Sequence, residues 1–211
     1  SPSVQLRITP VGELEMISTH DQILGGPSGQ IFQACTFPAD PSYALEIQRL
    51  ALRVGEVLKR RGVLGRFGVD FVSVPRDGGW EHFAIEINLR KGGTTHTFQM
   101  LQFLTGGRYD PDRAGFVTPA GDVRCYYATD NVVSPAYRRL TPQDLFEIAG
   151  QRGLRFDGES QTGVVFMLVG ALSEFGKLGV VSIDVDRDAA RRRFRGTVAV
   201  LDEEAATPPA A

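Results

Sequence analysis

The sequence has 211 residues, of which 42% are hydrophobic and 23% charged, a composition typical of a folded globular protein. It has 23 Lys and Arg residues against 25 acidic ones, so the formal net charge of −2 lacks the positive field that non-specific nucleic-acid binding needs. No apolar run approaches the roughly 18 residues of a membrane span. Because only Cys35 and Cys125 are present, a disulfide scaffold is excluded and we expect a cytoplasmic protein. The net charge and the lack of an apolar span predict neither nucleic-acid nor membrane partners.

The first part of the chain is predicted to contain strands around one helix. Val4–Thr9 and Glu13–Ser18 have the pattern of a hairpin. Asp40 and Pro41 are typical of a helix start, because the aspartate accepts from free N–H groups and proline needs no donor. The apolar spacing that follows predicts a helix that ends at Gly62.

Two β-rich runs, Arg66–Val74 and His82–Asn88, follow this helix and are joined by an Asp-Gly-Gly turn, which strongly indicates a second hairpin. A short helix is expected near Thr97–Leu104. Residues 109–130 are rich in turn signals, with a further hairpin around residues 118–122.

The remaining elements are a helix that starts at Thr141, two strands and a last helix. The two strands are expected at Val164–Leu172 and Leu178–Val185, and the last helix after Asp186. Together the elements predict an α+β fold with a mostly antiparallel sheet and the first helix packed behind it.

Polar side chains interrupt the two apolar strands of the second hairpin. Asp70 lies within the first strand, and Glu86 and Asn88 lie within the second. The two-residue spacing puts Glu86 and Asn88 on one face, and pairing of the strands allows Asp70 to face them. We therefore expect these three side chains to converge.

Two carboxylates and a carboxamide on one sheet face need a compensating charge. Their hard oxygen atoms favour Mg²⁺, or Mn²⁺, over zinc or copper. Arg90 and Lys91 follow directly, and a glycine-rich and hydroxyl-rich run then extends over residues 92–97, as phosphoryl chemistry requires. The alternative is that the two acids form buried ion pairs with Arg66 and Arg90.

The order of Asp in a strand, a glycine-bearing turn and then Glu-x-Asn resembles the metal-binding end of the ATP-grasp ligases. Residues 86–97 are also similar to the Glu-x-Asn…Gly-x-Thr-x-His-Ser loop of D-alanine–D-alanine ligases. Three segments are more similar still to the pheganomycin-type peptide ligases: the Arg-Lys-Gly-Gly-Thr-Thr-His motif, residues 18–22 and residues 161–166. Those enzymes join a carboxylate to an amine through an acyl phosphate made from ATP.

The resemblance implies a role for each matching residue. Asp70, Glu86 and Asn88 would hold the Mg²⁺ that bridges the ATP phosphates. Arg90 would bind the transferring phosphoryl group, and the Gly92 N–H would face the tetrahedral oxyanion, so these two are the expected catalytic residues. Thr97 stands where the D-alanine–D-alanine ligases have a serine that receives the incoming carboxylate. Apart from the resemblance, strand parity suggests that Arg7 contacts the substrate.

The resemblance implies that residues 1–110 form the metal-binding carboxy-terminal lobe of the grasp. The predicted elements indicate a hairpin or linker at residues 111–138 and a small α+β unit at residues 139–205. The small residues and prolines of residues 206–211 predict a disordered tail.

The resemblance further implies an earlier lobe that covers the ATP phosphates, and this sequence starts where the second lobe would start. The expected function is therefore the carboxy-terminal portion of an ATP-dependent carboxylate–amine ligase, which alone neither binds ATP tightly nor turns over. Its expected partners are ATP, a small carboxylic acid, an amine or peptide, and either an amino-terminal half or a second copy. A non-catalytic binding or assembly module that keeps the fold is the alternative, and a kinase-like phosphoryl transfer is a third possibility.

Overall fold

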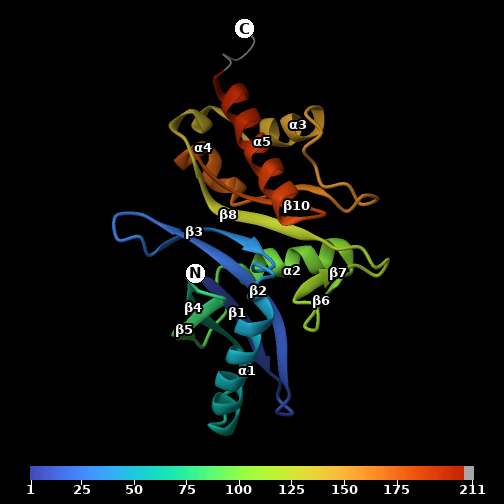
Figure 1. The fold of residues 1–211 in the computed structure, drawn as a ribbon. Coiled ribbons are helices and arrows are strands. Elements are labelled where there is room, and N and C mark those ends of the chain that lie inside the picture. Colours follow the sequence, from blue (N-terminus) through green and yellow to red (C-terminus); the bar gives the residue numbers. More distant parts are fainter. Residues whose placement is uncertain (207–211) are drawn as a thin grey trace. The chain divides into compact units, whose positions relative to one another are not determined.

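The computed structural model describes residues 1–206, which divide into two compact units, residues 1–123 and a second unit that begins at Arg124 (Figure 1). The elements of the first unit are β1 (Pro2–Ile8), β2 (Leu14–Gly25), β3 (Ile31–Phe37), α1 (Ala44–Arg60), β4 (Gly65–Arg76), β5 (Gly79–Asn88), α2 (Thr94–Thr105), β6 (Arg108–Asp110) and β7 (Gly115–Val117). Those of the second are β8 (Cys125–Val133), a 3₁₀ turn (Pro135–Arg139), α3 (Pro142–Gln151), β9 (Gly163–Met167), a 3₁₀ turn (Val169–Ala171), α4 (Leu172–Phe175), β10 (Lys177–Asp184) and α5 (Arg187–Ala206).

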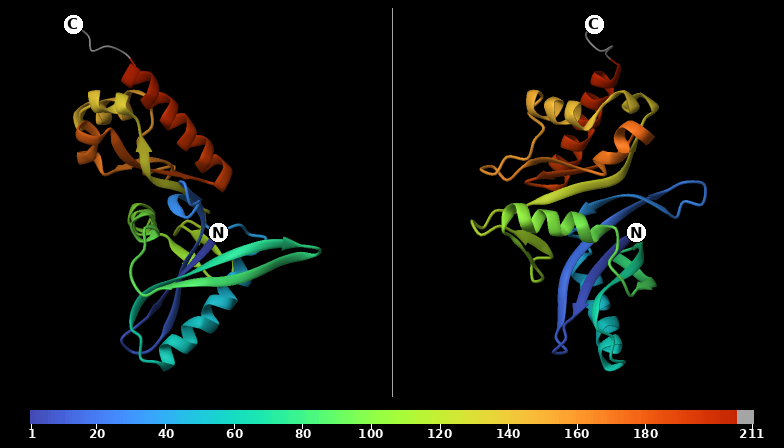
Figure 2. Two further views of the ribbon diagram at one scale, coloured as in Figure 1. Left: turned by 90° about the vertical axis from the view of Figure 1, so that its left-hand side faces the viewer. Right: turned by 180° about the vertical axis from the view of Figure 1, so that it is seen from behind.

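The main sheet of the first unit is antiparallel, with the strand order β5-β4-β1-β2-β3. Its central strand β1 alternates between the two faces: Val4, Leu6 and Ile8 are buried in a core with α1, whereas Ser3 and Gln5 belong to the other face. The β4–β5 hairpin forms one edge of the sheet and extends as a long ribbon (Figure 2).

Helix α1 begins at Ala44, later than Asp40 and Pro41 had predicted. The Asp40 carboxylate accepts a hydrogen bond from the Ser42 backbone N–H at 2.9 Å, and the Asp40 carbonyl accepts from the Ala44 N–H at 2.9 Å. Asp40 therefore shapes a turn that leads into the helix rather than capping its first turn.

The second unit contains the strands β8, β10 and β9 and has its own core. Strand β10 is buried along most of its length and lies between β8 and β9, with antiparallel pairing on both sides. Helix α5 packs against β10, and its residues Leu201 and Ala205 belong to the core of this unit. At the start of α3, Thr141 and Asp144 form a capping box, which fixes the helix start predicted at Thr141.

The α+β fold class and its mostly antiparallel sheet are confirmed. The structure adds strands that the sequence did not predict, among them β3, β6 and β8, and it has a 3₁₀ turn and α4 where one strand and a turn were expected. Apart from Ala206, the predicted tail at residues 206–211 lies outside the described residues. The predicted domain limits stay predictions.

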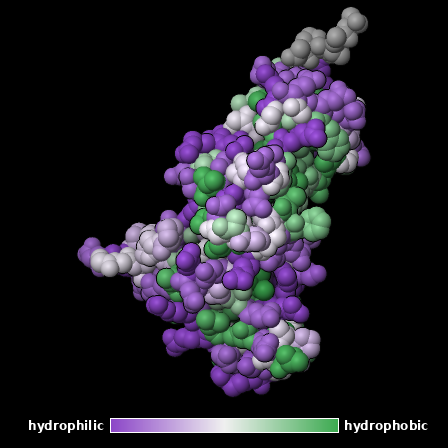
Figure 3. All heavy atoms as spheres, turned by 90° about the vertical axis from the view of Figure 1, so that its right-hand side faces the viewer, coloured by the Kyte–Doolittle hydropathy of each residue, from purple (hydrophilic) through white to green (hydrophobic). Residues whose placement is uncertain are grey.

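The face shown in Figure 3 mixes hydrophilic and hydrophobic residues. Among the helices within residues 1–206, none is both long enough and apolar enough to cross a bilayer.

Candidate functional site

The β4–β5 hairpin brings three of the predicted site residues together. Asp70 pairs directly with Glu86 across the ladder, and Gly68 pairs with Asn88. Since Gly68 and Asp70 are two residues apart on β4, Glu86, Asn88 and Asp70 share one face of the sheet. This convergence agrees with the register expected from the sequence. The role of the three residues as metal ligands stays a prediction.

Asp70 is the centre of a hydrogen-bond network that orients both of its carboxylate oxygens. Asn88 Nδ2 donates to Asp70 Oδ2 at 3.1 Å, and Gln22 Nε2 donates to Oδ1 at 3.0 Å. The Ser3 hydroxyl also bonds to this carboxylate and itself accepts from Gln5 Nε2 at 2.8 Å. Residues of β1, β2 and β5 therefore fix the position of a single acid on β4.

The pKa of Asp70 is raised above its ordinary value of 3.8, first by burial and then by the neighbouring charge of Glu86, while hydrogen bonds from Ser3 and Gln22 oppose the shift. A hydrogen bond between the Asp70 and Glu86 side chains raises the pKa of Asp70 further. A divalent cation would relieve this repulsion, and two carboxylates with an amide oxygen are a donor set that suits Mg²⁺ or Mn²⁺. The residues present therefore fit the metal that the sequence predicted.

The ion pairs predicted as the alternative are not present. Within residues 1–206, neither Asp70 nor Glu86 forms an ion pair with Arg66 or Arg90. The same part of the chain contains no group of three or more His, Cys, Asp or Glu residues able to hold a metal. A metal at this place would consequently rely on two carboxylates, the Asn88 amide and further oxygens from substrate or water.

The metal-free chain is expected to lose stability as the pH rises through the raised pKa of Asp70. The reason is that Asp70 holds its proton more tightly in the folded state than in the unfolded chain. Its protonation therefore contributes fully to the free energy of unfolding below the pKa of the unfolded chain. This contribution is lost as the pH rises through the pKa of the folded state. Mn²⁺ should therefore raise the melting temperature more at pH 7 than at pH 4, which thermal unfolding can measure. Asp70→Asn should remove both effects, whereas Asp77→Asn, in the exposed turn of the same hairpin, should leave them. An equal Mn²⁺ shift in Asp70→Asn would contradict the metal assignment.

The loop after β5 carries the predicted catalytic residues. Arg90 is exposed, and its Nη1 donates to the Lys91 carbonyl at 3.3 Å. The Gly92 carbonyl accepts from the Thr95 N–H at 3.1 Å, which closes the turn that starts α2. Thr97 is 4% exposed, and its hydroxyl donates to the Thr94 carbonyl at 3.0 Å. The phosphoryl, oxyanion and substrate roles of Arg90, Gly92 and Thr97 stay predictions.

Arg7 lies on the same face as Ser3 and pairs with Arg66 across the β1–β4 ladder. Its Nη1 is 3.8 Å from Glu15 Oε2, a half-exposed ion pair. Because Ser3 pairs with Asp70, the backbone of Arg7 lies about 13 Å from this pair along the strand. The substrate contact by Arg7 stays a prediction.

Sequence reasoning missed the residues that support Asp70, namely Ser3, Gln5 and Gln22. The alternation of polar and apolar residues along β1 is the signal that could have found Ser3 and Gln5. Gly68 belongs to the same arrangement: a Cβ added there would lie 2.9 Å from Gln5 Nε2, so its lack of a side chain leaves room for the Gln5 amide.

Comparison with protein families identifies the family to which the chain belongs. Residues 1–112 match the family described as "IQCH-like, ATP-grasp", and residues 144–197 match the "PGM1 C-terminal domain". The first match covers more than half of the chain. The chain therefore belongs to the ATP-grasp family, as the motif around Asp70, Glu86 and Asn88 predicted.

Two curated proteins resemble nearly the whole chain. The L-propargylglycine–L-glutamate ligase of Streptantibioticus cattleyicolor is 33% identical over 95% of this chain and 40% of its own length. The IQ motif-containing protein H of Danio rerio is 23% identical over 98% of this chain and 20% of its own length. The chain thus spans less than half the length of either relative. The first match confirms the predicted likeness to the pheganomycin-type ligases.

Solved structures show the same fold. The L-amino acid ligase of Bacillus licheniformis has a TM-score of 0.56 at 15% identity, covering 97% of this chain and 53% of the other. The phosphoribosylaminoimidazole carboxylase ATPase subunit of Aquifex aeolicus has a TM-score of 0.57 at 13% identity, and the match covers 95% of this chain and 55% of the other. At these identities the likeness concerns the fold alone.

Proposed function

We propose that this chain is the carboxy-terminal portion of an ATP-dependent ligase that joins a carboxylate to an amine through an acyl phosphate. The observation that carries the proposal is the convergence of Asp70, Glu86 and Asn88 on one sheet face, in the fold of an ATP-grasp protein. Support comes from the relative named as a ligase of L-propargylglycine and L-glutamate, and from the fold neighbour named as an L-amino acid ligase.

In this proposal Asp70, Glu86 and Asn88 hold Mg²⁺, which when bound neutralises the phosphate charge that accumulates during phosphoryl transfer. Ser3, Gln22 and Asn88 orient the Asp70 carboxylate by hydrogen bonds. These hydrogen bonds hold the acid in place before the substrates arrive, so little reorganisation is needed during the reaction.

The loop between β5 and α2 supplies the remaining groups. Arg90 is exposed and presents a planar cation to the transferring phosphoryl group. The backbone of Gly92 approaches the oxyanion closely, because no side chain intervenes, and Thr97 contacts the incoming carboxylate. The co-substrates are ATP, a small carboxylic acid and an amine or peptide.

The relatives are longer than this chain, so we assign to it the metal end of the site and to an amino-terminal half the nucleotide-binding lobe. On this assignment the 211-residue chain alone hydrolyses no ATP and binds it weakly. Micromolar ATP affinity in a calorimetric titration of this chain would contradict the assignment.

The reaction itself is tested by oxygen transfer. When this chain is combined with an amino-terminal nucleotide-binding half, a carboxylate labelled with ¹⁸O should deliver one labelled oxygen to the released phosphate, because the acyl phosphate forms through that oxygen. An amide product should appear at the same time. Labelled phosphate without an amide would indicate a different acceptor, and unlabelled phosphate would exclude an acyl phosphate.

A non-catalytic module with the same fold is the second candidate. It is favoured by the second relative, whose printed name states no ligase activity. Binding of Mn²⁺ and ADP without amide formation in the assembled protein would support it.

A further inference from the structure

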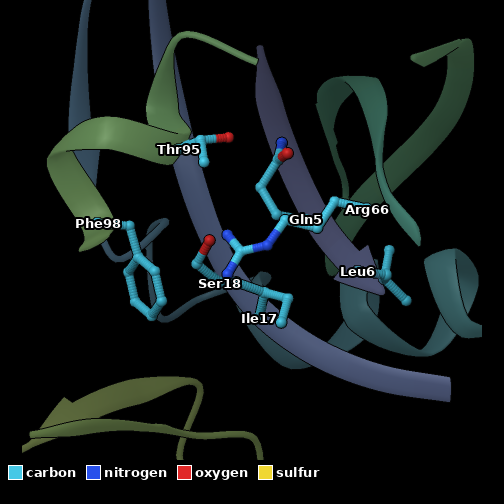
Figure 4. A pocket seen from close by; sticks show the side chains of 7 residues that line it. All are labelled: Gln5, Leu6, Ile17, Ser18, Arg66, Thr95 and Phe98. Carbon is cyan, nitrogen blue, oxygen red and sulfur yellow. The ribbon is translucent and has the colours of Figure 1, made fainter. Parts of the chain in front are cut away.

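A narrow pocket lies on the polar face of the first unit, between its strands and the start of α2. Its polar lining comes from Gln5 of β1, Ser18 of β2, Arg66 of β4 and Thr95 of α2, and apolar side chains complete the wall. Figure 4 shows the Arg66 guanidinium directed across the strands toward Ser18. Ser18, Arg66 and Thr95 have no role in the reaction described above, and Gln5 acts there only through its hydrogen bond to Ser3.

The pocket offers a positive charge and an unused hydroxyl. Arg66 is half-buried, and no carboxylate is among the residues that line the pocket. Ser18 is 1% exposed, and its Oγ has no hydrogen-bond partner within the described part of the chain. Leaving a buried hydroxyl without a partner costs free energy, about 1–3 kcal/mol. A ligand oxygen next to Arg66 would satisfy the hydroxyl and balance the charge.

The size of the pocket limits what can enter. Its volume of about 10 Å³ is enough for one water-sized atom. A carboxylate can insert one oxygen edge-on while the rest of the molecule stays outside. A phosphate group is bulkier and tetrahedral, so the pocket suits it less well.

The pocket is connected to the candidate metal site through the strands. Arg66 and Asp70 are four residues apart on β4, so they share a face, with backbones separated by about 13 Å. Gln5, which lines the pocket, donates to the Ser3 hydroxyl, and Ser3 bonds to Asp70. An extended amino-acid or peptide substrate could therefore reach from one site to the other.

We propose that Arg66, with the hydroxyls of Ser18 and Thr95, binds a carboxylate of an amino-acid or peptide substrate that is not the carboxylate activated by ATP. The proposal rests on the ligase function proposed above and adds a specificity-determining subsite. It makes Arg66 a substrate-binding residue and assigns it no part in phosphoryl transfer.

Binding is tested directly with the 211-residue chain labelled with ¹⁵N. N-acetylglycine should shift the backbone amide signals of Ser18, Arg66 and Thr95 in a saturable way, and the neutral N-acetylglycinamide should bind at least 10-fold more weakly. Arg66→Gln should weaken N-acetylglycine binding to the same extent. Arg53→Gln, on the exposed side of α1, is the matched control and should bind normally. Equal binding of the acid and the amide, or inorganic phosphate binding in place of N-acetylglycine, would overturn the proposal.

Ser18→Ala provides a second variant in case Arg66→Gln fails to fold. It removes only one buried oxygen and should weaken N-acetylglycine binding several-fold; unchanged binding in both variants would also overturn the proposal.

In the assembled ligase, Arg66→Gln should raise KM for a substrate with a free carboxylate about 10-fold, leave kcat nearly unchanged, and have no effect on its carboxamide analogue. If no ligation occurs but N-acetylglycine still binds through Arg66, the proposed function fails and the pocket assignment stands. If ligation occurs and Arg66→Gln changes neither N-acetylglycine binding nor KM, the proposed function stands and the pocket assignment fails.

Discussion

Replacement of Asn88 by Ala is expected to lower acyl-phosphate formation by at least about 100-fold, which corresponds to about 2.7 kcal/mol of transition-state stabilisation. The variant loses the amide oxygen proposed as a metal ligand and also the Nδ2 donor that lies 3.1 Å from Asp70 Oδ2. Asn88 is only half-buried at the end of β5, so the fold should persist. The rate is measured as ATP- and carboxylate-dependent hydroxamate formation in the ligase assembled with its nucleotide-binding half.

Asn88→Asp separates the two contributions of this side chain. It keeps an oxygen for the metal but removes the N–H donor and adds a negative charge beside Asp70 and Glu86. We expect metal binding to persist and the activity to need a higher pH, because like charge raises the pKa of Asp70 further. If Asn88→Ala retained full turnover with bound Mg²⁺, the site would not be the one that activates the carboxylate.

Much of the site could be predicted from the sequence because its signal is local. Asp70, Glu86 and Asn88 interrupt apolar strands that a short turn joins, so the pairing and the common face followed from strand geometry alone. The supporting residues could not be found in this way. Gln22 reaches Asp70 from β2, 48 positions away in the sequence, and only the strand order reveals that contact.

The unpredicted strands have a similar explanation. β3 contains Gln33 and Thr36 among its apolar residues and lacks a clean alternation, and four of its seven residues are buried through tertiary packing. β8 lies in a stretch where turn signals prevailed, yet its pairing with β10 holds it extended. Tertiary contacts therefore overrode the local pattern in both segments.

Burial of a histidine makes the first unit sensitive to acid. His20, in the middle of β2, is fully buried with its ring 5.3 Å from that of Phe37, and burial lowers its pKa from 6.5 to about 3. The folded state therefore resists the proton that the unfolded chain accepts. The contribution of neutral His20 to the free energy of unfolding is complete above pH 6.5 and is lost progressively as the pH falls toward 3.

Between pH 7 and pH 5 this single group is expected to reduce the free energy of unfolding by about 2 kcal/mol, which denaturant titrations at the two pH values can measure. His20→Gln should flatten the pH dependence by that amount whatever its effect on absolute stability, because glutamine does not titrate. His96→Gln, on the exposed side of α2, should leave the dependence unchanged. A slope that persists in His20→Gln would mean that another group carries the acid sensitivity, and that His20 accepts a proton within the fold.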